Sequence, residues 1–229
     1  MARKFDPEAF ERMDLPQPVS AELVEDLDNL RKLNHWFGSY RLIRHFLHRW
    51  LKPNTSVRIL DLATGSADIP REIIRWCRAR NIEVKIDAVD FHPSTLEIAK
   101  TKSTDFSEIQ FIQSDIRTFS SAEKWDIVIC SLALHHFSNE DATQILMRCR
   151  ELSSRHVLVA DLCRTAFAKL GIWFITETIF RAPMTKYDGR LSIARAFSYE
   201  EFHALASNAG WKNFQHQRFP VTRQAIWLE

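Results

Sequence analysis

Short apolar runs alternate with longer amphipathic stretches along most of this chain, and each spacing predicts one kind of element. A strand buried on both faces is expected where a few apolar residues follow one another, and a helix where they recur every three or four positions. The expected strands cover about 57–62, 82–90, 109–113, 125–131, 156–161, 211–218 and 221–228. The expected helices cover about 21–33, 40–51, 69–80, 94–102, 139–152 and 198–210.

Two segments interrupt this alternation. Residues 1–20 are polar and contain three prolines, which predicts an extended or partly ordered lead-in. Residues 185–190 read as a loop, because tyrosine, aspartate and glycine follow one another there. Pro53–Ser56 reads as a linker, so we divide the chain into a lead-in with a helical cap (1–53) and a main domain (54–229).

Composition narrows the class of protein. The chain has 229 residues, of which 45% are hydrophobic, so it can bury a sizeable core. A net charge of +2 gives no indication of a nucleic-acid partner or an anionic membrane, and no apolar run approaches a membrane span of about 20 residues. The four cysteines show no metal-binding spacing, so we expect reduced thiols, a cytoplasmic location and no metal site. The first four residues are followed by Phe5-Asp-Pro-Glu and not by an apolar region, so we expect no signal peptide.

Residues 57–70 contain the most informative pattern. Four apolar residues predict a buried strand that ends near Asp61, and Gly65 stands where the backbone must turn sharply. Ser66 or Asp68 could cap the helix that follows. A carboxylate, a small turn and a helix N-terminus together form a cofactor site, because free backbone N–H groups face the ligand there.

The stretch Asp61-Leu-Ala-Thr-Gly-Ser-Ala67 resembles motif I of the class I S-adenosylmethionine (SAM)-dependent methyltransferases. Ala63 and Ala67 stand where that motif usually has glycine. Alanine permits close approach of a ligand but disfavours a left-handed backbone. The resemblance implies an α/β fold with a doubly wound, mostly parallel, Rossmann-like sheet of seven strands in the order 3-2-1-4-5-7-6, and an N-terminal helical cap.

The resemblance also assigns cofactor-binding residues. Asp90 ends the second strand, where a carboxylate can accept hydrogen bonds from both ribose hydroxyls, and Phe91 could pack on adenine. By similarity, adenine would be bound at Asp115 and Ile116, and Ser131 and Leu132 would lie beside the sulfonium. The methionine part would be held by Asp61, Ala63, Thr64, Gly65 and Asp68.

His135 and His136 follow the fourth strand in a loop that resembles motif IV. Imidazole is a suitable general base at neutral pH, so either could deprotonate the acceptor, with His136 preferred. Contact with the cofactor or with a neighbouring loop is the alternative. Methyl transfer does not strictly need a base, because in-line positioning of the reactants does most of the work.

The acceptor is expected to be a small molecule, because the chain resembles bacterial methyltransferases of the ubiquinone/menaquinone type. Tyr187-Asp-Gly-Arg and Arg195-Ala-Phe-Ser resemble members encoded beside type III polyketide synthases, which implies an aromatic or polyketide-like acceptor and a role in secondary metabolism. The apolar stretch 163–183 is either a core helix or a pocket lining. Trp173, Tyr187 and Arg195 are the candidate acceptor-binding residues, although Arg195 could equally form a structural ion pair.

Two other functions stay open from the sequence. A Rossmann-fold nucleotide-dependent oxidoreductase would use a related glycine-rich turn. A non-catalytic cofactor-binding protein could contact a partner chain through the basic face of the 40–52 helix. That face carries Arg41, Arg44, His45, His48, Arg49 and Lys52, although a solvated helix face is the simpler interpretation. A homodimer is a further alternative.

Overall fold

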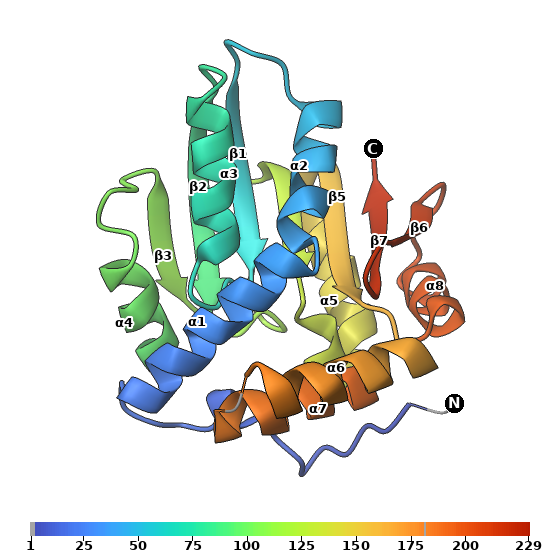
Figure 1. The fold of residues 1–229 in the computed structure, drawn as a ribbon. Coiled ribbons are helices and arrows are strands. Elements are labelled where there is room, and N and C mark those ends of the chain that lie inside the picture. Colours follow the sequence, from blue (N-terminus) through green and yellow to red (C-terminus); the bar gives the residue numbers. More distant parts are fainter. Residues whose placement is uncertain (1–2, 181) are drawn as a thin grey trace.

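A central sheet organises the computed structural model, which describes residues 3–180 and 182–229. Its strand order is β3-β2-β1-β4-β5-β7-β6, and only β7 runs antiparallel to its neighbours (Figure 1). The expected fold class and strand order are therefore confirmed. The strands are β1 (Ser56–Leu62), β2 (Glu83–Asp90), β3 (Ile109–Gln113), β4 (Trp125–Ser131), β5 (Ser153–Leu162), β6 (Gln215–Phe219) and β7 (Arg223–Leu228).

Helices cover both faces of the sheet, which explains why its central strands are apolar on both sides. One core packs α2 and α3 against the sheet, and the other packs α5 and α8. The helices are α1 (Ala21–Trp36), α2 (Ser39–Trp50), α3 (Asp68–Arg78), α4 (Pro93–Thr101), α5 (Asn139–Leu152), α6 (Ala166–Thr178), α7 (Pro183–Arg195) and α8 (Tyr199–Asn208). Two short 3₁₀ helices are η1 (Arg12–Asp14) and η2 (Leu134–His136).

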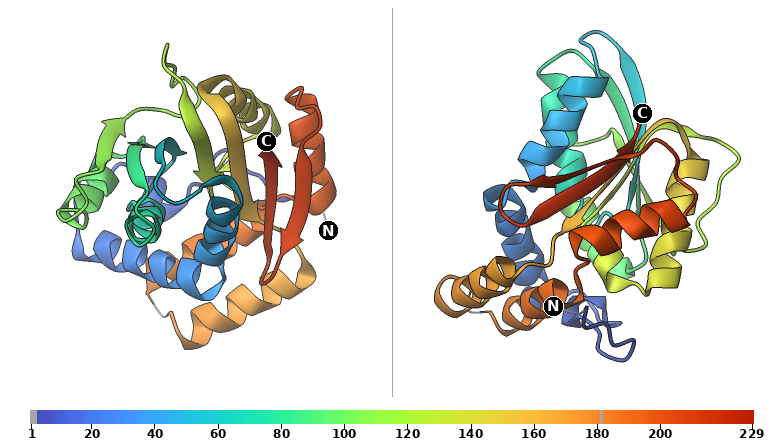
Figure 2. Two further views of the ribbon diagram at one scale, coloured as in Figure 1. Left: turned by 90° about the horizontal axis from the view of Figure 1, so that it is seen from above. Right: turned by 90° about the vertical axis from the view of Figure 1, so that its right-hand side faces the viewer.

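A second layer covers the carboxyl ends of the parallel strands. Helices α1, α6 and α7 cross beneath these ends, and the N-terminal segment passes under α7 (Figures 1 and 2). None of the helices within the described residues is long and apolar enough to cross a membrane. The cap is thus built from the N-terminal segment with α1 and from the α6–α7 segment that follows β5. The division at residue 53 stays a prediction.

The expected loop at 185–190 is wrong, because these residues lie inside α7. Pro183 occupies the first turn of this helix, where its missing N–H costs no hydrogen bond. Gly189 lies against α6: a Cβ there would come within 3.3 Å of the Ile172 side chain. The glycine therefore permits close packing of two helices and does not mark a turn.

The lead-in is also more ordered than expected. Arg12 and Met13 donate their backbone N–H groups to the buried carboxylate of Asp188 on α7, at 2.7 and 3.1 Å. Lys4 donates its backbone N–H to the carbonyl of Ala194. These contacts hold residues 3–14 along α7.

Candidate cofactor and acceptor site

A cavity of about 720 Å³ lies at the carboxyl ends of the parallel strands. One side, which we call the cofactor half, is formed by the 61–67 turn and the ends of β2, β3 and β4. The other side, the acceptor half, is formed by residues 5–14, η2, α6 and α7. Ligands of open α/β sheets bind at this edge, so the cavity is the candidate functional site.

The 61–67 turn closes against the end of β2. Thr64 donates its N–H to the carbonyl of Val89 at 2.9 Å, and Gly65 donates its N–H to Asp90 Oδ2 at 2.8 Å. Ala63 and Ala67 have φ angles of 58° and 56°, so both alanines adopt the left-handed backbone that the sequence led us to disfavour. The turn thus keeps its shape without the glycines, at a cost of about 1–2 kcal/mol per alanine.

The cap of α3 also differs from expectation. Ala67 is the N-cap and makes no side-chain hydrogen bond, so neither Ser66 nor Asp68 has that role. Asp68 Oδ2 instead accepts hydrogen bonds from Tyr40 at 2.8 Å and Asn34 at 3.0 Å. Asp68 therefore ties the turn to α1 and α2 while it lines the cavity.

Asp61 supplies a buried carboxylate beside the turn. Its side chain is almost fully buried at the end of β1, and this burial raises the pKa of its carboxyl to about 7. The nearby Thr64 Oγ1 is buried and makes no hydrogen bond of good geometry within the described residues, although its closeness to Asp61 acts to lower that pKa. A cationic group with N–H donors, such as the ammonium of a methionine moiety, would satisfy both side chains.

Asp90 ends β2 and lines the same half of the cavity. Its two oxygens accept the N–H groups of Gly65 and His92, at 2.8 and 3.0 Å, and burial raises the pKa of its carboxyl. Each oxygen retains a lone pair, so ribose hydroxyls could still be bound. The structure therefore accommodates the expected role of Asp90.

The remaining expected cofactor residues also line the cavity. Asp115 makes an ion pair with Arg117 at 2.6 Å, and Phe91 is largely exposed. Leu132 has a left-handed φ of 57° and donates its N–H to Ala160 of β5. Every expected cofactor residue lies in the cofactor half: Asp61, Ala63, Thr64, Gly65, Asp68, Asp90, Phe91, Asp115, Ile116, Ser131 and Leu132. Their individual roles stay predictions.

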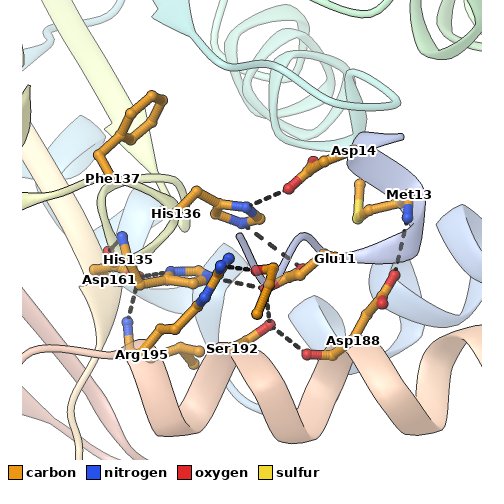
Figure 3. Close-up of polar contacts among 12 residues, drawn as sticks. Glu11, Met13, Asp14, His135, His136, Phe137, Asp161, Asp188, Ser192 and Arg195 are labelled. Atoms are coloured by element: carbon orange, nitrogen blue, oxygen red, sulfur yellow. Dashed lines mark hydrogen bonds and ion pairs between the residues drawn. The ribbon is translucent and has the colours of Figure 1, made fainter. Parts of the chain in front are cut away.

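The two histidines are held by carboxylates through their Nδ1 atoms. His135 Nδ1 lies 2.6 Å from Asp161 Oδ1, and His136 Nδ1 lies 2.7 Å from Asp14 Oδ2 (Figure 3). The opposite Nε2 atoms face a third carboxylate, that of Glu11, at 3.9 Å from His135 and 3.8 Å from His136. Both rings are thus oriented before any ligand arrives.

Burial and the nearby carboxylates shift the pKa values of the two histidines in opposite directions. Burial lowers the pKa of His135, and the facing Asp161 only partly opposes this shift. Burial also acts to lower the pKa of His136, but Glu11 and Asp14 outweigh it and raise that pKa to about 10. A general base must be neutral, so this arrangement favours His135 over His136 as a proton acceptor. A base role for either histidine stays a prediction.

Glu11 and Asp14 were not identified from the sequence. They lie in the polar lead-in, and the His136–Asp14 contact spans 122 positions. Burial raises the pKa of the Glu11 carboxyl to about 7, against the opposing charge of His136. The only sequence signal was the apolar side chains of Phe5, Phe10 and Met13 among the polar residues. The expectation of no metal site considered cysteines alone, and the structure places ligand atoms of Glu11, His135 and His136 within 4.8 Å of one another.

The three expected acceptor-binding residues do not line the cavity. Trp173 and Tyr187 are exposed. Arg195 is buried, and its guanidinium donates to the carbonyls of Asp6 and Ala9, so it holds the N-terminal segment. The same two helices do line the cavity through other faces, with Phe167, Gly171, Ile172, Ile175, Ser192 and Ile193. Helices α6 and α7 thus contribute to the cavity, but through faces other than those of the three expected residues.

The basic face of α2 is partly engaged within the chain. Arg44 pairs with Glu72 at 3.1 Å, and Arg49 pairs with Glu229 at 2.5 Å. His48 packs edge-on against Trp76. These contacts support the interpretation as a solvated helix face.

Comparison with known proteins matches residues 59–155 to a family model described as a methyltransferase domain. Ubiquinone/menaquinone biosynthesis C-methyltransferase of Rickettsia bellii is 29% identical over 116 residues, which are 51% of this chain and 45% of that protein. The Rickettsia felis protein of the same description is 28% identical over 113 residues, 49% of this chain and 44% of that protein. The matches thus span less than half the length of these curated relatives.

Solved structures share the fold over nearly the whole chain. Human N-acetylserotonin methyltransferase in complex with SAM has a TM-score of 0.65 at 17% identity, over 89% of this chain and 54% of that chain. Plantazolicin methyltransferase in complex with S-adenosylhomocysteine (SAH) has a TM-score of 0.63 at 13% identity, over 91% of this chain and 90% of that chain. Magnesium protoporphyrin IX methyltransferase from Synechocystis with bound SAH has a TM-score of 0.59 at 15% identity, over 94% and 90%. Residues 59–155 therefore match a methyltransferase-domain family model, and nearly the whole chain shares the fold of these solved methyltransferases.

Proposed function

We propose that this protein transfers a methyl group from SAM to a small, largely apolar acceptor of aromatic or polyketide-like character. The single observation that carries the proposal is that one cavity joins the two halves of the site. Its volume of about 720 Å³ lies in the range of small-molecule sites.

The chain's own residues fit the cofactor. Asp61 would accept hydrogen bonds from the ammonium of the methionine part, and Asp90 would accept them from the ribose hydroxyls. Asp115 and Ile116 would bind adenine, with Phe91 against its face. When bound, SAM supplies a methyl group already activated on a sulfonium, so the protein need only orient the acceptor and exclude water.

The acceptor half favours an apolar ligand. Helices α6 and α7 present Phe167, Ile172 and Ile193 to the cavity, together with Gly171, whose missing side chain leaves open space. The curated relatives are described as C-methyltransferases of ubiquinone/menaquinone biosynthesis, which supports an acceptor with an apolar body and a polar ring. Trp173, Tyr187 and Arg195 are no longer the residues we assign to acceptor contact.

Titration calorimetry with SAH, with NADH as the comparison ligand, tests the cofactor class. We expect micromolar binding of SAH and none of NADH, and the reverse result would indicate the oxidoreductase alternative. A panel of phenolic and polyketide compounds then tests the acceptor, with methylated product detected by mass spectrometry. Binding of SAH without product from any acceptor would favour the non-catalytic alternative. In that case, charge reversal at Arg41, Arg44 and Arg49 would test the basic face of α2.

A further inference from the structure

The acceptor half contains a group of side chains that the proposed methyl transfer does not by itself explain. Glu11 of the lead-in and the two histidines of η2 meet beside the cavity, and each offers one ligand atom within 4.8 Å of the others (Figure 3). We propose that Glu11, His135 and His136 bind one Zn²⁺ ion, which in turn binds an oxygen of the acceptor.

The first argument is the orientation of the imidazoles. Each histidine directs Nδ1 to a carboxylate, Asp161 or Asp14, at 2.6–2.7 Å. Each therefore presents Nε2 to the same carboxylate of Glu11. A carboxylate on the far nitrogen is the usual support of a metal-binding histidine, because it fixes the tautomer and orients the ring.

The second argument is distance. The two Nε2 atoms lie 3.9 and 3.8 Å from the Glu11 oxygens, too far for a hydrogen bond. Bonds of about 2.0–2.1 Å to a tetrahedral Zn²⁺ would place such ligand atoms about 3.4 Å apart. These two distances are to different Glu11 oxygens, Oε1 for His135 and Oε2 for His136, and one ligand atom from each residue lies within 4.8 Å of the others. Closure around one ion therefore needs side-chain movements of up to about 1.4 Å.

The third argument is that the carboxylate ligand is itself held. Glu11 is 2% exposed, and its Oε1 lies 2.7 Å from the hydroxyl of Ser192 on α7. Asp188 anchors the next two residues, Arg12 and Met13, by their backbone N–H groups. On the other side of Glu11, Arg195 donates to the carbonyls of Asp6 and Ala9, so the lead-in is fastened on both sides of the position where Glu11 enters the site.

The ligand set selects the metal. Two imidazoles and one carboxylate form a set used by catalytic zinc sites, in which the fourth position is left for water or substrate, and by non-haem Fe(II) sites. Methyl transfer involves no change of oxidation state, so it favours the redox-inactive Zn²⁺. Nitrogen ligands disfavour Mg²⁺, which prefers oxygen. Since the three residues line the cavity, the open position would face the acceptor.

The role of the ion rests on the proposed function. Coordination lowers the pKa of an acceptor hydroxyl or enol, so its proton passes to water without a histidine base. On transfer, the O–C bond to the methyl group forms and the C–S bond breaks, with its electron pair going to sulfur. The products are a methyl ether and SAH, and the released proton balances the charge lost from the sulfonium.

The experiment measures zinc in the whole protein after chelator treatment, reloading with zinc sulfate and desalting. We expect about one zinc per chain in the wild type, and at least a tenfold weaker zinc affinity in both Glu11→Gln and His136→Gln. Asp14→Asn should weaken zinc binding by about 10- to 100-fold, because it removes only the support of His136. Cobalt(II) is the spectroscopic probe: its visible bands should be those of a site with nitrogen ligands, and they should disappear in Glu11→Gln.

His203→Gln is the matched control, because His203 stacks near His216 on the surface, away from the cavity. Loss of zinc in this variant alone, unchanged zinc in Glu11→Gln, or no zinc in the wild type would each overturn the proposal. SAH titration of every variant shows that it is folded and separates the two proposals. Wild-type protein that binds SAH but no zinc refutes only the metal site, whereas zinc binding without SAH binding refutes the proposed cofactor.

Discussion

The cofactor half and the acceptor half of the cavity are built in different ways. In the cofactor half, the polar groups lie at or just after the carboxyl ends of neighbouring strands, from Asp61 near the end of β1 to Ser131 at the end of β4. In the acceptor half, Glu11 and Asp14 reach the histidines across more than a hundred positions. The first half is encoded locally by the order of strands, and the second exists only after tertiary packing. This difference predicts that the two halves can be damaged separately.

The largest effect is expected from Asp90→Ala in the cofactor half. Hydrogen bonds to a charged group contribute about 1.5–3 kcal/mol each, so loss of the ribose contacts should weaken SAH binding on the order of 100-fold. Asp87→Asn is the matched control, because Asp87 lies on the same strand but contacts Trp125 and Arg58 away from the cavity. Calorimetry that gave equal SAH affinity for Asp90→Ala and wild type would remove the ribose assignment.

Gly171→Phe should damage the acceptor half alone. A Cβ at Gly171 meets nothing within 4 Å, and the residue lines the cavity, so a phenyl ring can enter without displacing the backbone. We expect kcat/KM for a bicyclic acceptor to fall at least tenfold while SAH affinity stays within about twofold. Gly171→Ala provides the control, since it adds only helix propensity of about 1 kcal/mol. Equal loss of SAH binding and turnover would show that the halves are not separable.

The same contrast explains what the sequence could predict. The positions of the strands and of Asp61, Asp90 and Ser131 follow from apolar runs and a turn, which are local signals. The strand order came instead from the resemblance to the methyltransferases. The face that α6 and α7 turn to the cavity depends on which helices they pack against. Trp173 and Tyr187 are exposed, whereas Ile172 and Ile193 line the cavity. The sequence therefore indicated segments near the cavity, but not which of their residues face it.

Arg195 and Glu11 illustrate a second limit. Charged residues are usually exposed, so a charge pattern alone indicates solvent or a ligand. In this fold Arg195 is buried on backbone carbonyls of the lead-in, and Glu11 is buried beside two imidazoles. The partners of both are separated from them by most of the chain, so no window of the sequence contains the interaction.

The pH dependence of SAH binding tests the electrostatics of the cofactor half. The ionised form of Asp61 binds the ammonium, and burial raises the pKa of Asp61 in the free protein to about 7. Binding lowers that pKa, so a proton is released and affinity rises with pH. Between pH 6 and pH 8 we expect roughly a tenfold gain in affinity. Calorimetry in buffers of different ionisation enthalpy measures the released proton.

Asp61→Asn is the control for this titration, because it removes the carboxyl and keeps its size. The variant should bind SAH more weakly at pH 8 and should lose the dependence on pH. If SAH affinity still depended on pH in Asp61→Asn, the titrating group would be another one at the cavity, such as Glu11, whose pKa is also raised to about 7.

The smallest expected effect concerns the backbone of the 61–67 turn, where alanine adopts a left-handed conformation that it disfavours. Ala63 has a φ of 58°, and this left-handed backbone costs about 1–2 kcal/mol for a residue with a side chain. Glycine avoids that cost but loses about 0.5–1 kcal/mol of stability, because its unfolded chain has more conformational freedom. Ala63→Gly should therefore raise the free energy of unfolding by roughly 0.5 kcal/mol. Ala133→Gly is the control: Ala133 has a φ of −128°, so glycine should only destabilise there. Urea unfolding of both variants measures the difference, and a loss of stability in Ala63→Gly would mean that the alanine side chain stabilises the turn by packing.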